Sequence, residues 1–241
     1  MGINKKRLVK EFVKLVRIDS ISKKEGKIAG YIKKELKDLG LRVKEDNAGS
    51  KLGGESGNII GYMKGVKKYP RLLFNAHLDT HIPGENIKPK IRGLKIYSSG
   101  DTILGADDKA GVAAMLEMIK VIKEDKISHG DLVILFTVAE EIGLAGAKHL
   151  KKKDIAADAG FAIDGGRSNK IVISAPEQVN IEVDIKGRAA HAGVHPEHGL
   201  SAIKVAAKAI SCIKEGRIDF ETTANIGIIK GGMATNIVPE H

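Results

Sequence analysis

The chain has 241 residues, of which 42% are hydrophobic and 29% charged, and this composition excludes a disordered or collagen-like protein. No stretch approaches about 18 consecutive apolar residues, and the first residues lack the apolar run of a secretory signal. The net charge is +10, but no nucleic-acid-binding motif occurs and few aromatic rings are present to stack on bases. We therefore expect a cytoplasmic protein that binds neither nucleic acid nor membrane.

Helices and strands alternate along the chain up to about residue 174. Apolar residues recur at helical spacing in three segments, and apolar or alternating runs predict strands between them. The predicted helices are residues 5–17, 28–39 and 108–123, and the predicted strands are residues 41–45, 58–63, 71–76, 131–138 and 160–164. The strand at 71–76 is apolar enough to be buried on both faces, and the strand at 160–164 is also expected to be buried. This alternation predicts an α/β fold.

Three shorter segments of this region are less regular. Residues 49–57 are rich in glycine and are expected to form a loop. Residues 81–105 are expected to be irregular, with one short strand near residues 95–97, and residues 143–151 to form a short helix.

The pattern changes after residue 174. Residues 179–186 alternate strictly between apolar and other residues, which predicts a strand with one face in solvent. A helix over residues 200–213 and a strand over residues 225–229 follow. We expect a first domain over residues 1–174 and a partial second domain over residues 175–241. The single cysteine, Cys212, fits a reducing compartment and is expected to be a buried, small apolar residue.

Acidic residues and one histidine follow the ends of the predicted strands. His77 and Asp79 follow the strand at 71–76 and lie on one side of the chain, so that the Asp79 carboxylate can bind the second imidazole nitrogen. Glu140 and Glu141 follow the most apolar strand, and Asp164 ends the last strand. The ends of neighbouring strands meet at one crevice, so we expect these side chains to converge there.

Asp107 and Asp108 open the long predicted helix. An aspartate at this position is usually a helix cap, and with two adjacent acids one can cap while the other faces the crevice. The adjacent Glu140 and Glu141 could lie on the surface, although two neighbouring carboxylates repel unless a cation or proton lies between them. One imidazole with several carboxylates suits Zn²⁺, Mn²⁺ or Co²⁺ better than Ca²⁺.

The segments that hold these residues resemble the motifs of the two-zinc aminoacyl hydrolases, which include peptidase T, carboxypeptidase G, aminoacylase and succinyl-diaminopimelate desuccinylase. The motifs are HLDT at residues 77–80, GADDKAG at 105–111, AEEIG at 139–143 and IDG at 163–165, with lid-like segments at 187–197 and 234–239. The likeness is greatest to the peptidase T-like branch. It implies a layered catalytic domain with a mixed, largely parallel sheet and helices on both faces, and the start of a smaller α+β, ferredoxin-like lid domain.

The resemblance implies a cofactor of two divalent metal ions, zinc first, with cobalt or manganese as alternatives. His77, Asp107 and Asp164 would hold the first ion. Asp107 would bridge to a second ion, which Glu141 would also bind. With only these two ligands in the sequence, the second site is expected to be weak.

Catalytic and substrate-binding roles follow from the same resemblance. Glu140 would act as the general base, and Asp79 would orient His77. In the lid, His191 would reach the substrate carbonyl oxygen and Asn236 would position the substrate.

The histidines that follow His191 allow another interpretation. His191, His195 and His198 could form a separate metal cluster, but Pro196 is expected to interrupt any helical spacing between them. The favoured interpretation is that His195 and His198 are surface loop residues. Three further histidines are interpreted in the same way: His81, His129 and His149.

Members of the resembled family are longer, and the part that follows their lid motif carries a further metal-binding histidine and a substrate-binding arginine. We therefore expect a C-terminally truncated chain. The predicted function is a zinc-dependent metallopeptidase that hydrolyses short peptides, as a tripeptide aminopeptidase does, with a homodimer through the lid as a compatible assembly. An N-acyl amino acid deacylase or carboxypeptidase on the same metal site is the first alternative. A catalytically inactive fragment or basic binding module is the second.

Overall fold

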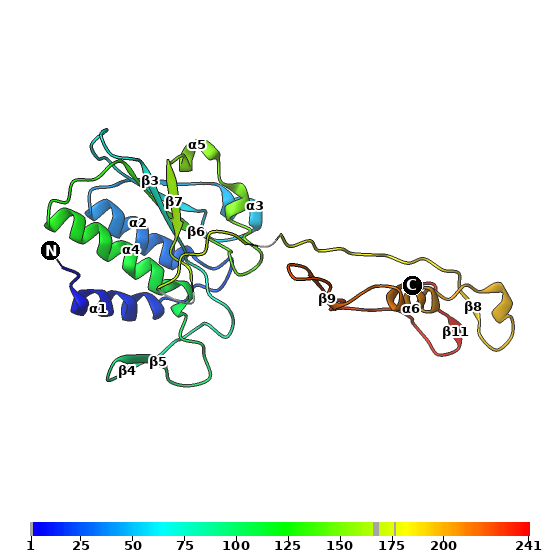
Figure 1. The fold of residues 1–241 in the computed structure, drawn as a ribbon. Coiled ribbons are helices and arrows are strands. Elements are labelled where there is room, and N and C mark those ends of the chain that lie inside the picture. Colours follow the sequence, from blue (N-terminus) through cyan, green and yellow to red (C-terminus); the bar gives the residue numbers. More distant parts are fainter. Residues whose placement is uncertain (1, 166–168, 176) are drawn as a thin grey trace. The chain divides into compact units, whose positions relative to one another are not determined.

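The chain forms two compact units in the computed structural model, which describes residues 2–165, 169–175 and 177–241 (Figure 1). The units are Met1–Ser168 and Asn169–His241. Among the described residues, no helix has both the length and the apolar character that a bilayer span requires.

A five-stranded mixed sheet is the centre of the first unit. In spatial order its strands are β1 (Arg42–Glu45), β2 (Ile59–Met63), β6 (Leu132–Thr137), β3 (Leu72–His77) and β7 (Ala159–Ala162). Parallel pairing joins β6, β3 and β7, whereas β1, β2 and β6 are joined by antiparallel pairing. The predicted α/β class with a mixed sheet is confirmed, and its parallel part is the half that carries the predicted site.

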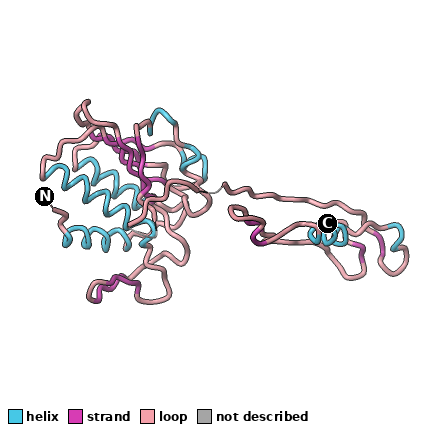
Figure 2. Tube along the Cα trace, viewed as in Figure 1, coloured by secondary structure: helices cyan, strands magenta, loops and turns pink. Residues whose placement is uncertain are grey.

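Three helices cover one face of this sheet: α1 (Lys5–Val16), α2 (Gly26–Asp38) and α4 (Ala106–Glu124) (Figure 2). Their apolar sides meet β6 in the main core, where Leu15, Ile32, Leu116 and Phe136 are fully buried. Burying a side chain of this size contributes about 1.5–3 kcal/mol relative to leaving it exposed. On the other face, Val133 and Leu135 pack with Ile155 of the short helix α5 (Lys152–Ile155).

Several local predictions for the first unit are wrong. The predicted loop at residues 49–57 begins with a short helix, α3 (Ala48–Leu52), which Gly53 ends in a left-handed conformation. Residues 81–105 contain two strands, β4 (Pro89–Arg92) and β5 (Lys95–Ser98), paired as a hairpin around Gly93, whose φ is 58°. Residues 143–151 contain only the 3-10 turn η1 (Ala147–His149). A glycine in a left-handed conformation lies at each of these places: Gly53 after α3, Gly93 between β4 and β5, and Gly143 before η1.

The last strand of the sheet is less buried than its sequence predicts. Among the described residues β7 pairs only with β3, and all four residues of β7 are exposed. The Phe161 side chain stacks on Phe74 with 5.5 Å between ring centroids. Apolar residues favour burial of a strand, but a strand is fully buried only when other elements pack against it on both sides. Here β7 is an edge strand.

The second unit has little regular structure. It contains α6 (Ala202–Ser211), the 3-10 turn η2 (Pro196–His198) and two short antiparallel pairs. The pairs are β8 (Ala190–His191) with β11 (Ile237–Val238), and β9 (Gly216–Arg217) with β10 (Thr223–Ala224). Cys212 is exposed just after α6, which corrects its predicted burial, because the apolar face of that helix is itself largely uncovered.

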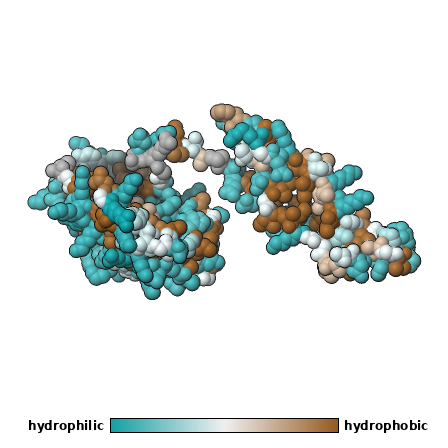
Figure 3. Space-filling view, turned by 90° about the horizontal axis from the view of Figure 1, so that it is seen from below, coloured by the Kyte–Doolittle hydropathy of each residue, from teal (hydrophilic) through white to brown (hydrophobic). Residues whose placement is uncertain are grey.

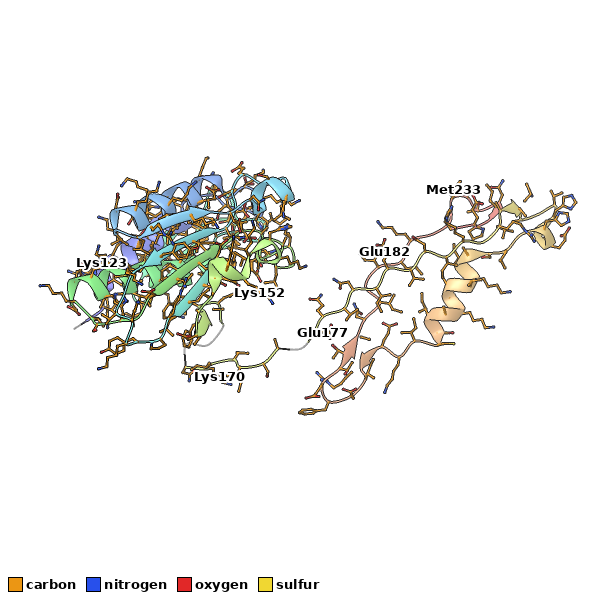
Figure 4. The ribbon with its side chains drawn as sticks, turned by 90° about the horizontal axis from the view of Figure 1, so that it is seen from above. Lys123, Lys152, Lys170, Glu177, Glu182 and Met233 are labelled. Atoms are coloured by element: carbon orange, nitrogen blue, oxygen red, sulfur yellow. The ribbon has the colours of Figure 1, made fainter. Side chains whose placement is uncertain are left out.

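The strands predicted at residues 179–186 and 225–229 do not form. Both segments lack strand pairing, and Figure 4, which labels Glu177 and Glu182, shows the first as an extended chain. Alternation favours an extended backbone, but a strand also needs a partner for its N–H and C=O groups. As a result Val179, Ile181 and Val183 are 69–82% exposed, and Figure 3 shows apolar atoms gathered on the surface of this unit.

Candidate metal centre

The candidate site of the first unit is centred on His77, the last residue of β3. The imidazole is buried, and its Nε2 lies 3.0 Å from Asp107 Oδ1 and 4.0 Å from Asp164 Oδ2. Asp107 lies at the start of α4, and Asp164 follows β7. One ligand atom from each residue lies within 4.8 Å of the other two. His77 and Asp164 therefore converge as the strand-end argument predicts, and Asp107 reaches them from the start of a helix.

Glu140 and Glu141 approach the same imidazole from the end of β6. Glu140 Oε2 lies 4.0 Å from His77 Nε2, and His77, Glu140 and Glu141 form a second group whose ligand atoms lie within 4.8 Å of one another. Ala139 adopts a left-handed conformation with φ of 52°, which L-residues rarely adopt, and so turns the chain directly before the two glutamates.

Asp79 contacts the imidazole and also the backbone of the two glutamates. The His77 Nδ1 lies 2.9 Å from the backbone carbonyl of Asp79 and 3.5 Å from its carboxylate. The carboxylate accepts hydrogen bonds from the Ser22 hydroxyl (2.7 Å) and from the backbone N–H groups of Glu140 (2.9 Å) and Glu141 (3.2 Å). Burial opposes ionisation of Asp79, but these bonds and His77 outweigh it and lower its pKa. Asp79 thus stays charged and fixes the backbone of both glutamates.

Glu25 is a supporting residue that the sequence prediction missed. It is fully buried, and its Oε1 accepts hydrogen bonds from the N–H groups of Lys23 and Ala139, each at 2.9 Å. Its Oε2 is buried without a hydrogen-bond partner among the described residues. Burial raises the pKa of this carboxyl group. The signal in the sequence was an acidic residue directly before α2, which an analysis of apolar spacing does not weigh.

The structure decides between the two acids that open α4. Asp108 is buried, and it accepts hydrogen bonds from the N–H of Gly111 at 3.1 Å and of His77 at 3.3 Å. Asp107 instead contacts the His77 ring. Burial, together with the nearby charge of Asp164, raises the pKa of Asp108 to about 7. Asp108 therefore caps and braces the helix start, and Asp107 faces the site.

The electrostatics of the cluster favour a cation. Burial and then neighbouring carboxylates raise the pKa values of Glu140, Glu141 and Asp164, because ionising one acid beside others is unfavourable. Burial opposes a charged imidazole, yet hydrogen bonds from His77 to Asp79 and Asp107 raise the pKa of His77 to about 10. An imidazole among converging carboxylates is the donor set of a zinc-type site, and the residues fit such an ion.

His81 lies beside this cluster. Its side chain is 65% exposed, and its Nε2 lies 2.9 Å from Glu141 Oε2. His81 is therefore a surface histidine that also contacts a predicted metal ligand.

The two predicted lid residues lie together in the second unit. His191 is in β8, and Asn236 directly precedes β11, whose Ile237 pairs with His191. The Ala192 N–H donates to the backbone carbonyl of Asn236 at 2.9 Å. Both side chains belong to exposed residues.

Comparison with known protein families assigns the class of the chain. Residues 58–199 match the model of Peptidase family M28, and residues 177–241 match that of the peptidase dimerisation domain. The first of these matches covers more than half of the chain, so the chain belongs to Peptidase family M28. The peptidase class that the motifs predict is thereby confirmed.

Individual relatives narrow the likeness to peptidase T. A structure of aminopeptidase PepT from Bacillus cereus is 46% identical, with a TM-score of 0.88, and covers 99% of this chain. A tripeptidase structure from Staphylococcus aureus is 41% identical, with a TM-score of 0.84 and the same coverage. The protein YqjE of Bacillus subtilis is 48% identical over 98% of this chain, and peptidase T of Clostridium botulinum is 29% identical over 90%. The chain spans 62–65% of the length of these four relatives.

Proposed function

We propose that the protein containing this chain is a metal-dependent aminopeptidase that hydrolyses the amide bonds of short peptides, with tripeptides as the substrate class. The observation that carries the proposal is the convergence of Asp107, Asp164 and Glu140 on Nε2 of His77, at 3.0–4.0 Å. The likeness to PepT and to a tripeptidase, each above 40% identity, supports the choice of substrate.

The cofactor we propose is a pair of divalent ions, zinc first. His77, Asp107 and Asp164 would hold one ion, and Asp107 and Glu141 the other. Such ions lower the pKa of water and polarise a carbonyl oxygen. The identity and the mutual distances of His77, Asp107 and Asp164 support the first ion. For the second ion the support is the residue types, since Glu141 is grouped by distance with His77 and Glu140.

Glu140 is the general base in this proposal. Its backbone is held by Asp79, and its half-buried carboxylate faces the imidazole. A raised pKa brings a carboxylate closer to the working pH, which favours proton transfer in both directions. Glu140 would take a proton from the attacking water and return it to the leaving amine.

The second unit would supply substrate contacts in the whole protein. His191 and Asn236 are the proposed contacts, His191 to the substrate carbonyl oxygen. The match to the peptidase dimerisation domain supports a homodimer through this unit. A single cysteine supports a cytoplasmic location.

The test is the variant Glu140→Gln in the protein that contains this chain. The amide cannot accept the water proton, so we expect tripeptide turnover to fall by about 10²–10⁴-fold while bound zinc is unchanged. Glu182→Gln, an exposed glutamate of the second unit, is the control and should keep full turnover.

Turnover near the unmodified rate in Glu140→Gln would refute the base assignment. A panel of tripeptides, dipeptides and acyl amino acids decides the substrate, because a deacylase would prefer the last of these. A chain that retains no zinc after dialysis would be a non-catalytic binding module instead.

A further inference from the structure

A second group of metal-type ligands lies in the second unit, around the turn η2. His195 Nδ1 lies 3.2 Å from Glu197 Oε1, and His198 Nε2 lies 3.9 Å from the same oxygen. The two imidazole rings are stacked, with 5.2 Å between centroids and 15° between planes. One ligand atom from each residue lies within 4.8 Å of the other two, and all three side chains are exposed.

The backbone explains why these side chains meet. Residues three apart eclipse in a 3-10 turn, so His195 and His198 project from the same side. Pro196 was expected to break this spacing, but it occupies the first position of the turn, where no N–H is needed. Pro196 therefore does not separate His195 from His198, although the group that forms contains Glu197 and not His191.

The turn is also held in place by contacts outside the three ligands. The His198 N–H donates to the carbonyl of His195 at 3.2 Å, and the Arg188 Nε donates to the carbonyl of His198 at 2.6 Å. Leu200, just after the turn, exchanges backbone hydrogen bonds with Arg188 at 2.8 and 2.9 Å. A metal would therefore need to order side chains only, which reduces the entropic cost of binding.

We propose that His195, Glu197 and His198 form a separate binding site for a divalent transition metal such as Zn²⁺. Two imidazoles and one carboxylate are a recurring zinc donor set, and the exposed side leaves a coordination position for water. The site shares no residue with the cluster around His77, so it does not depend on the proposed peptidase activity.

The test compares zinc binding by the full chain and by the double variant His195→Ala/His198→Ala. After equilibrium dialysis against buffered free Zn²⁺, the double variant should hold one equivalent less than the unmodified chain. His149→Ala, which removes a half-buried histidine of the first unit, is the control and should lose none. Glu197→Gln should weaken zinc binding at this site but not abolish it, because both imidazoles remain.

A measurement on the unmodified chain makes the test independent of how the variants fold. Diethyl pyrocarbonate labels accessible imidazoles, and peptide mass spectrometry locates the label. Zn²⁺ should reduce labelling of His195 and His198 by at least about tenfold, since coordination occupies the reactive nitrogen. Equal zinc content in the chain and the double variant, with unchanged labelling of both histidines, would overturn the proposal.

Discussion

At the scale of single residues, two buried carboxylates set the direction of Glu140, the predicted general base, and Glu141, a predicted metal ligand. Three successive backbone N–H groups donate to them: Ala139 to Glu25, and Glu140 and Glu141 to Asp79. Each N–H would otherwise be an unpaired donor at the end of a buried strand. The direction of Glu140 and Glu141 therefore depends on Asp79, which lies beside the imidazole, and on Glu25, which binds the residue that precedes them.

We predict that Glu25→Ala lowers peptide turnover by about 10–100-fold, the range that supporting residues of metal sites show. The variant removes the acceptor of the Ala139 N–H, so the left-handed conformation of Ala139 before Glu140 is no longer fixed by that hydrogen bond. Glu25→Gln keeps a carbonyl oxygen in that place and should recover most of the loss. Kinetics on both variants, with zinc content measured in parallel, check this. Equal losses in Ala and Gln variants would contradict the acceptor role.

At the scale of elements, the site depends on a close approach between α4 and the chain that follows β7. A Cβ at Gly111 would lie 2.3 Å from Asp108 Oδ1 and 2.3 Å from the carbonyl oxygen of Ile163, the neighbour of Asp164. Such distances are far inside van der Waals contact. Only glycine lets the helix bearing Asp107 approach Asp164 this closely.

Gly111→Ala should therefore separate the two ligand-bearing segments and reduce zinc bound at the first unit. Gly30→Ala is the matched control, since its Cβ would meet nothing within 4 Å and it lies inside α2. That control should instead raise the free energy of unfolding by about 0.5–1 kcal/mol. Thermal unfolding and zinc content of both variants are the measurements. Full zinc binding by Gly111→Ala would show that the approach is not needed.

A second element-scale contact joins α1 to α4. The Arg7 guanidinium donates to the buried Glu117 carboxylate at 2.7 and 2.9 Å, and the Asn4 N–H donates to it at 2.9 Å. The hydrogen bond from Arg7 is the main cause that lowers the pKa of Glu117 below its usual 4.5. A lowered pKa in the folded state means stabilisation that is complete above pH 4.5 and lost as pH falls through the folded-state value.

Glu117→Gln should therefore lower the free energy of unfolding by about 1–3 kcal/mol at neutral pH. The difference between this variant and the unmodified chain should shrink as the pH falls below 4.5, because protonation removes the same interaction. Denaturant unfolding at several pH values, taken as a difference between the two proteins, isolates Glu117 from the other carboxylates. A difference that is constant with pH would contradict the ion pair as the cause.

At the scale of the whole molecule, negative charge is concentrated at one edge of the first unit, although the chain as a whole carries +10. The raised pKa values of Glu140, Glu141 and Asp164 mean that this edge destabilises the metal-free fold as pH rises through them. A bound cation removes that repulsion. We therefore expect metal binding and folding of the first unit to be coupled.

Zinc at a hundred times its dissociation constant should raise the free energy of unfolding by about 2.7 kcal/mol. The gain should be smaller in acid, where protons compete for the same carboxylates. Calorimetry of the His195→Ala/His198→Ala background confines the effect to the first unit, and Asp107→Asn in that background should lose most of it. An unfolding temperature independent of zinc would contradict the coupling.

The sequence by itself determined the features that depend on neighbouring residues. Apolar spacing located α1, α2 and α4, and apolar runs located β2, β3 and β6, because each pattern reflects which side of one element is covered. The same runs placed His77, Glu140 and Asp164 at strand ends, so their convergence could be predicted.

Only the tertiary structure decided the features that need a distant partner. It placed Asp107 against the His77 ring and Asp108 at the helix start, and it revealed the hydrogen bond from Ala139 to Glu25. It also left β7 at an edge and residues 179–186 unpaired. The physical reason is that strand pairing, burial and hydrogen bonding of carboxylates involve groups far apart along the chain. A local sequence pattern indicates that a residue can form such a contact, but it does not identify the distant residue that is its partner.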